Sequence, residues 1–146
     1  IVPGVAIGTD IIVGFPTETD EEFRETCDVF RLLGYDVAFL YTYSPRKGTP
    51  AMRWKDDVPE EVKAKRLQEL MELHAAITEK KRESFLGKRV QVLFERKNKD
   101  GKHLYGRTRC WKKVIAQGDE SLIGQEVIVK VTGFHHQTLI ASPLLS

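Results

Sequence analysis

The sequence has few cysteines and no long hydrophobic run. Its two cysteines, Cys27 and Cys110, cannot form a disulfide framework, and neither has a nearby Cys or His at metal-ligand spacing. No stretch approaches the roughly 18 apolar residues that a transmembrane helix needs. The sequence shows neither a basic leader nor a small-residue cleavage site, so we expect no targeting signal. These absences exclude a disulfide-rich secreted protein and favour a cytoplasmic one with no membrane partner.

The composition is that of a globular chain with an uneven charge distribution. Of its 146 residues, 41% are hydrophobic and 30% are charged, which suits one domain or two small ones. Residues 1–84 hold 12 Lys and Arg against 16 Asp and Glu, whereas residues 85–146 hold 11 against 5. This excess of positive charge indicates a polyanionic partner for the second part, or simply the basic surface of a small domain.

The first part reads as a β-α-β unit followed by a long helix. Residues 5–15 and 37–43 are apolar runs, typical of strands buried on both faces of a parallel sheet. Between them Thr19 and Glu22 form a capping-box pattern that starts a helix, and Gly34 ends it. A second helix begins after residue 57 and runs for about 27 residues. Its expected apolar stripe is Val62, Leu67, Leu70, Leu73 or His74, and Ile77.

From Lys88 onward the hydrophobic pattern alternates with a period of two. Five short strands are expected near residues 90–94, 104–109, 113–117, 126–132 and 138–142, with an Asp100-Gly101 hairpin turn between the first two. A sandwich needs more strands. The pattern therefore favours a five-stranded antiparallel barrel of the oligonucleotide-binding (OB-like) kind.

Two segments of the first part have the residues of a ligand site. Residues 10–18 end a strand with a Gly-Phe-Pro turn before a helix, and residues 43–51 follow the second strand with a hydroxyl, a guanidinium and a flexible glycine. Ligands bind at the carboxyl ends of strands in α/β sheets, and Gly14 would let a flat ligand approach the backbone. The alternative is an ordinary β-α turn. Neither segment contains a nucleophile–base pair or paired carboxylates.

The most basic stretch of the second part mixes cations with aromatic rings. Such a hairpin can contact phosphates while its rings stack on unpaired bases. The alternative is a solvated charged face. The candidate nucleic-acid-binding residues are Arg96, Lys97, Lys99, Lys102, Tyr105, Arg107, Arg109, Trp111, Lys112 and Lys113.

The motifs together resemble the radical S-adenosylmethionine methylthiotransferases, most closely the tRNA-modifying MiaB type. The resemblance covers nearly the whole chain and lies in TDIIVGFP (9–16), YSPRKGTPA (43–51), VPE (58–60), RL (66–67), GRT (106–108) and LIG (122–124). It implies that residues 1–85 are the last part of a radical S-adenosylmethionine (TIM-like) barrel with its connecting helix. Residues 86–146 would be a TRAM domain, an RNA-binding module.

The resemblance also implies a function. Family enzymes use S-adenosylmethionine and two [4Fe-4S] clusters to add a 2-methylthio group to N6-isopentenyladenosine beside the tRNA anticodon. A sister branch acts on N6-threonylcarbamoyladenosine, and a stand-alone RNA-binding module without catalysis is a third reading. The partners implied are the tRNA anticodon stem-loop and the missing N-terminal domains. By residue match, the cofactor-binding positions are Ile12, Val13, Gly14, Tyr43, Ser44 and Arg46.

The cluster-binding cysteines of the family have no counterparts here. Cys27 and Cys110 match neither cluster motif, so we expect an inactive C-terminal fragment with no catalytic residues, no metal ligands and no bound cofactor. Thr17 also departs from the family, where Gly is usual, which predicts a shifted turn with ligand binding retained.

Overall fold

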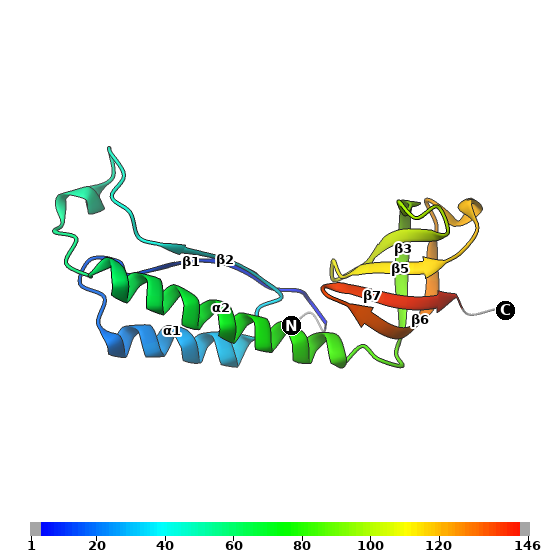
Figure 1. Ribbon diagram of the computed structural model, residues 1–146, viewed down its shortest axis with the longest axis horizontal. Coiled ribbons are helices and arrows are strands. Elements are labelled where there is room, and N and C mark those ends of the chain that lie inside the picture. Colours follow the sequence, from blue (N-terminus) through cyan, green and yellow to red (C-terminus); the bar gives the residue numbers. More distant parts are fainter. Residues whose placement is uncertain (1–3, 144–146) are drawn as a thin grey trace. The chain divides into compact units, whose positions relative to one another are not determined.

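The computed structural model describes residues 4–143 (Figure 1). The described chain forms two compact units. One is Ala6–Glu79, and the other is residues 80–143 together with Gly4 and Val5. We call them the α/β unit and the barrel unit. The division falls within the last turns of a helix, whereas a domain boundary after residue 85 stays a prediction.

The α/β unit is a two-stranded parallel sheet covered by two helices. Strand β1 (Gly8–Val13) pairs in parallel with β2 (Val37–Thr42), with Gly8 opposite Val37. Helices α1 (Asp20–Leu33) and α2 (Glu60–Glu83) lie on one side of this sheet (Figure 1). A short 3-10 helix, η1 (Pro50–Arg53), interrupts the loop before α2. The predicted β-α-β unit and long helix are confirmed.

Local signals fix both ends of α1. The Thr19 side chain accepts a hydrogen bond from the Glu22 N–H at 3.2 Å, and the Thr19 N–H donates to Glu22 Oε2 at 2.8 Å. This is the predicted capping box, which satisfies two backbone donors that the helix leaves free. At the other end Gly34 adopts a left-handed φ of 57° and donates its N–H to the Phe30 carbonyl.

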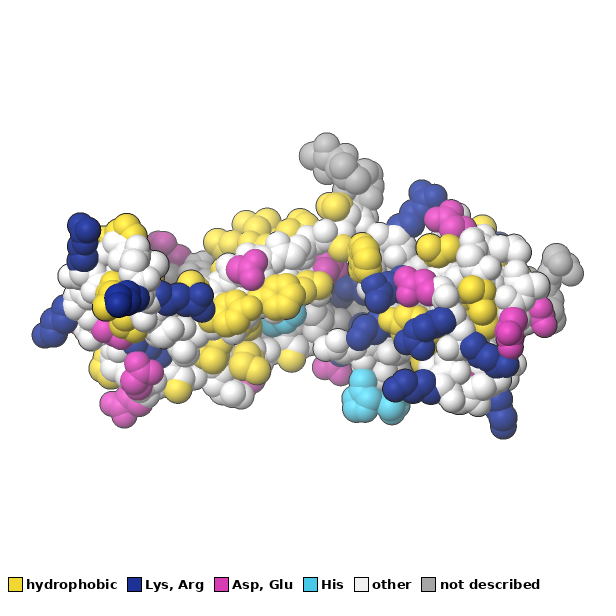
Figure 2. Space-filling view, turned by 90° about the horizontal axis from the view of Figure 1, so that it is seen from above, with side chains coloured by type: hydrophobic (Ala, Val, Ile, Leu, Met, Phe, Trp, Pro, Cys, Tyr) yellow, Lys and Arg dark blue, Asp and Glu magenta, His cyan; other side chains and the backbone are white. Residues whose placement is uncertain are grey.

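Only one face of the two-stranded sheet is buried. Its core contains Val13 with Phe23, Cys27, Phe30 and Leu70 from the helices. On the other face Ile12, Phe39 and Tyr41 are each more than half exposed, and hydrophobic side chains gather there in Figure 2. The prediction of strands buried on both faces is therefore wrong for this chain, because no second layer of the described residues covers them.

The buried stripe of α2 differs from the predicted one. Leu70 is fully buried, and Leu67, Leu73 and Ile77 pack against the same core. The stripe begins, however, with the buried charged residues Lys63 and Arg66 rather than with Val62.

The barrel unit is a closed five-stranded barrel with the spatial order β3-β4-β5-β7-β6. The strands are β3 (Arg89–Lys97), β4 (His103–Thr108), β5 (Lys113–Gln117), β6 (Glu126–His135) and β7 (Thr138–Pro143), with the 3-10 helix η2 (Glu120–Leu122) before β6. Four pairings are antiparallel, but β5 and β7 run parallel. The prediction of a wholly antiparallel barrel is corrected at this one pairing, which joins two strands that are not consecutive in the chain.

Alternating residues fill the barrel, as the sequence predicted. Val92 and Phe94 from β3 meet Val129 and Val131 from β6 in a fully buried core. Gly106 is needed for close approach, since a Cβ there would lie 2.4 Å from the Leu93 carbonyl oxygen. In the part of the chain that the structure describes, no helix is long and apolar enough to cross a membrane.

Candidate functional site

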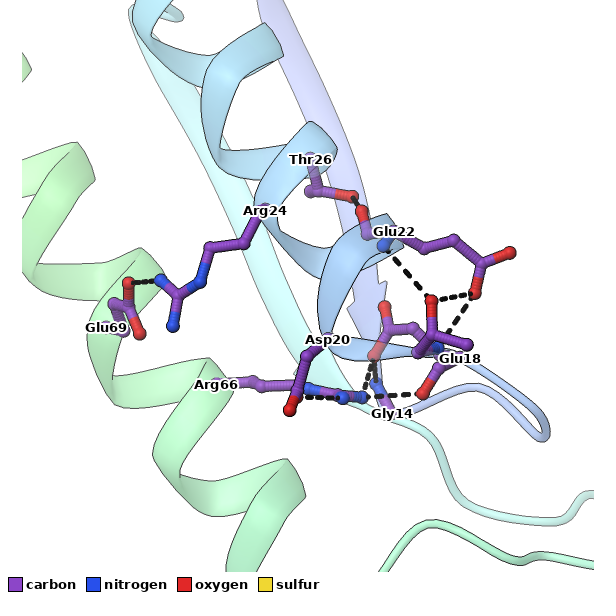
Figure 3. A network of polar contacts seen from close by, with 9 residues as sticks. Gly14, Glu18, Asp20, Glu22, Arg24, Thr26, Arg66 and Glu69 are labelled. Atoms are coloured by element: carbon purple, nitrogen blue, oxygen red, sulfur yellow. Dashed lines mark hydrogen bonds and ion pairs between the residues drawn. The ribbon is translucent and has the colours of Figure 1, made fainter.

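A buried arginine holds the turn between β1 and α1. Arg66 on α2 donates to Glu18 Oε2 and to Asp20 Oδ1, each at 2.7 Å (Figure 3). The same Glu18 oxygen accepts the Gly14 N–H at 2.6 Å. Both side chains of the Glu18–Arg66 pair are at least four-fifths buried. The network therefore fixes the backbone that leaves β1, where the sequence analysis predicts a ligand site.

The turn itself is a type II turn. Its Glu18 N–H donates to the Phe15 carbonyl at 2.9 Å, Pro16 takes the first central position, and Thr17 takes the second with φ 74°. That position favours glycine, because a side chain with a branched Cβ is strained at positive φ. The Thr17 N–H is held by Asp57 Oδ1 at 2.8 Å. Thr17 therefore occupies this glycine-favouring position with a strained backbone.

The structure gives a reason for glycine at position 14 that the sequence alone did not give. Its φ is 71°, and a Cβ on it would lie 2.3 Å from Lys63 Cγ. Lys63 is fully buried, with its ammonium 2.7 Å from both Asp56 and Glu60. The close approach seen at Gly14 is thus to Lys63, and contact with an adenosine stays a prediction.

The remaining predicted cofactor positions lie around the same strand ends. Val13 and Tyr43 are buried, and the Tyr43 N–H donates to the Val13 carbonyl at 2.8 Å, which extends the β1–β2 pairing. Ile12, Ser44 and Arg46 are exposed. The structure therefore brings the two predicted segments together, with three of their side chains available to a ligand.

The sequence analysis assigned no role to two charged residues of this region, although Arg66 is part of one of its motifs. On α2, Lys63 lies three residues before Arg66, and Arg66 lies four residues before Leu70. All three side chains therefore share one buried face of the helix. That spacing was the available signal. A charged residue on an apolar helical stripe indicates a buried ion pair, because an unpaired charge is too costly to bury.

The predicted nucleic-acid residues lie on the outside of the barrel. Cations and aromatic rings alternate there: the Arg96 guanidinium is 4.3 Å from the centre of the Tyr105 ring, and that of Arg107 is 4.7 Å from the centre of the Trp111 ring. Hydrogen bonding of the Arg107 guanidinium to the Tyr105 hydroxyl oxygen raises the pKa of Arg107, and this outweighs the lowering caused by burial. The face is therefore charged and partly aromatic, and Figure 2 shows many Lys and Arg side chains on this unit.

The two predicted stacking residues have different environments. Tyr105 is only 9% exposed, whereas Trp111 is 69% exposed. Trp111 sits at φ 61° in a turn that Thr108 closes by accepting the Trp111 N–H on its carbonyl at 2.9 Å. Strained backbone of this kind persists where the surroundings hold it in place. Of the two predicted stacking residues, Trp111 therefore has the accessible ring, whereas the Tyr105 ring is packed beneath Arg96, and contact with a base stays a prediction.

Some of the predicted nucleic-acid-binding cations form ion pairs with acidic residues. Lys97 is paired with Glu120, and Arg109 lies 3.4 Å from Glu126. The hairpin end between β3 and β4 carries Lys99 and Lys102, which are exposed. The other predicted cations, Lys112 and Lys113, follow Trp111 at the start of β5, where Lys113 is the cross-strand neighbour of Arg107.

Comparison with known proteins finds a family model for the second part of the chain and relatives that match most of its length. The TRAM domain family matches residues 83–144. The chain is 60% identical over 141 residues to the tRNA-2-methylthio-N(6)-dimethylallyladenosine synthase of Protochlamydia amoebophila, covering 96% of this chain and 31% of that protein. Proteins of the same name from Carboxydothermus hydrogenoformans and Bacillus cereus are each 48% identical over 90% of the chain and 30% and 26% of their own lengths.

The chain spans less than a third of the length of these relatives. The resemblance predicted from the motifs is confirmed: residues 83–144 match the TRAM domain family, and the chain is similar over nearly all of its length to part of the synthases of this name.

Proposed function

We propose that the chain is the C-terminal portion of a tRNA methylthiotransferase, in which the barrel unit holds the tRNA. The enzyme would add a 2-methylthio group to N6-isopentenyladenosine next to the anticodon. The high identity to synthases named for this product supports the reaction. The observation that carries the RNA-binding role is the outward cation–aromatic face that ends in the exposed Trp111 ring. Phosphates bind such cations, and unpaired bases stack on such rings.

We further propose that the α/β unit is the closing part of a radical S-adenosylmethionine barrel. Two parallel strands with helices on one face form one repeat of an α/β barrel. The exposed residues Ile12, Phe39 and Tyr41 would then face the barrel interior, covered by strands from the remaining two-thirds of the parent protein. Alone, the chain leaves this apolar face open and should associate at high concentration.

The family's cofactors do not all fit the residues of this chain. Cys27 is buried in the α/β core, and Cys110 lies in the other unit with its Sγ 3.2 Å from Thr108 Oγ1. Among residues 4–143, no group of three or more potential metal-ligating side chains comes together. A [4Fe-4S] cluster needs about four such ligands, so we propose that the cluster ligands lie in parts of the parent protein outside these residues.

S-adenosylmethionine fits better than a cluster does. The exposed Ile12, Ser44 and Arg46 at the carboxyl ends of β1 and β2 suit an adenosine and its charged methionine part. The Glu18–Arg66 network would then act by fixing the backbone around Gly14.

Binding of tRNA to the 146-residue chain at varied salt tests the RNA-holding role. With four cations engaged, affinity should fall roughly 10²-fold between about 50 and 200 mM salt, because each contact releases close to one counterion. Changing Arg107 and Arg109 to Ala should weaken all tRNAs about equally and flatten the salt dependence. Trp111→Ala should lower affinity with the slope unchanged, since stacking releases no counterion.

A matched control removes two cations from the other unit. Arg31 and Lys65 are exposed on α1 and α2, and their change to Ala should leave binding to tRNA unchanged. Affinity that does not depend on salt, or an Arg107/Arg109 double variant that binds as tightly as the parent chain, would contradict the proposal.

A further inference from the structure

The outer surface of the barrel carries an open pocket between the charged residues described above. Its apolar floor is Leu93, whose cross-strand neighbours are Arg107 on β4 and Glu126 on β6. Trp111 and Glu95 also line it. An apolar floor, an aromatic wall and a charged rim suit a flat ligand with a polar edge.

The Trp111 ring contacts one cation and is otherwise largely exposed. The Arg107 guanidinium lies 4.7 Å from the ring centre, while 69% of Trp111 is exposed. A cation on one face of an indole leaves the opposite face free for stacking. Trp111 therefore provides the wall against which a planar base can lie.

The pocket contains two carboxylates, Glu95 and Glu126, which differ in their hydrogen-bond partners. Ionised carboxylates only accept hydrogen bonds, and they repel phosphate. Glu126 Oε2 already accepts from Gln91 at 2.7 Å and from Arg109 at 3.4 Å. Glu95 lies 3.7 Å from Arg107 Nε as an ion pair and makes no hydrogen bond to any residue that the structure describes. Glu95 is thus the acceptor that is available to a ligand.

We propose that this pocket binds one unpaired guanine of the RNA, stacked on Trp111 and hydrogen-bonded to Glu95. The inference rests on the proposed RNA-binding function. Guanine presents two parallel donors, N1–H and the N2 amino group, which match the two oxygens of one carboxylate. Adenine and cytosine pair one amino donor with an adjacent ring acceptor, and uracil places its single N–H between two carbonyls. When adenine, cytosine or uracil donates one hydrogen bond to the carboxylate, an acceptor atom of the base faces the second carboxylate oxygen, and the two acceptors repel each other.

Short single-stranded RNAs test the choice of base on the 146-residue chain. Each oligonucleotide is oligouridine with one central guanine, adenine, cytosine or inosine, titrated at low salt by fluorescence anisotropy. The guanine oligonucleotide should bind at least about fivefold more tightly than those with adenine or cytosine, the lower end for a bidentate contact. Inosine keeps N1–H but lacks the N2 amino group, so its affinity should fall between guanine and adenine.

The Glu95→Gln variant separates base selection from charge. It should bind oligouridine at least as tightly as the parent chain, because a negative charge is lost, but its preference for guanine should disappear. Glu83→Gln makes the same charge change at an exposed position outside the pocket and should keep the preference. Equal affinity for all four oligonucleotides would overturn the guanine site while leaving tRNA binding intact. Failure to bind tRNA as well would overturn both proposals.

Discussion

Replacing Arg66 by Met should destabilise the α/β unit far more than breaking an exposed ion pair between the same two helices. In the Arg66→Met variant the Glu18 carboxylate, 13% exposed, keeps the Gly14 N–H as its one hydrogen-bond donor among the described residues. Removing one member of a fully buried pair costs about 3–5 kcal/mol. Since Asp20, the second partner of Arg66, is 90% exposed, we expect a loss of about 2–3 kcal/mol in the free energy of unfolding.

The Arg24–Glu69 pair provides the matched control. It also joins α1 to α2, but its side chains are 58% and 34% exposed. Arg24→Met should therefore cost only about 0–1 kcal/mol. Urea unfolding followed by far-ultraviolet circular dichroism is the measurement, because α1 and α2 are the α-helices of the described chain.

A double variant tests the reason for the loss. Glu18→Gln removes the buried charge that Arg66→Met leaves without its partner, so the double variant should be more stable than the sum of the two single losses predicts. Equal losses for Arg66→Met and Arg24→Met, or strictly additive losses in the double variant, would refute the reasoning.

Three further outcomes are expected. Thr17→Gly should raise the free energy of unfolding by up to about 1 kcal/mol, because glycine tolerates the φ of 74° without strain, whereas Thr17→Ala should not, and a thermal scan compares them. Hydrogen bonds from Thr19 lower the pKa of Glu22 below its usual 4.5. The stability that this carboxylate contributes is therefore present above about pH 4.5 and is lost as the pH falls through the lowered pKa. In acid titrations the Glu22→Gln variant should show a smaller loss of helix than the parent chain. A fragment of residues 86–146 should fold alone, shown by dispersed NMR amide signals, since every fully buried residue of its core lies in a barrel strand and only the partly buried Phe85 is lost from the side chains packed against that core; a random-coil spectrum would contradict this.

The sequence by itself determined the elements whose signals are local. The capping box of Thr19 and Glu22 involves residues three apart, and both of its hydrogen bonds are present. The Asp100-Gly101 hairpin depends on a turn of a few residues, and Asp100 accepts the N–H groups of Lys102 and His103 as such a turn requires. Alternation of apolar residues likewise placed Val129 and Val131 inside the barrel. These features follow from backbone geometry over less than ten residues.

The tertiary structure decided the environment of each candidate site residue. Arg66 reaches Glu18 across 48 positions of sequence, and no local pattern specifies such a contact. Tyr105 and Trp111 are equal as sequence candidates, yet packing beneath Arg96 buries the first, and a strained turn exposes the second. The parallel β5–β7 pairing that closes the barrel is a long-range choice of the same kind. Burial and pairing depend on which distant segments meet, and that is fixed only when the chain packs as a whole.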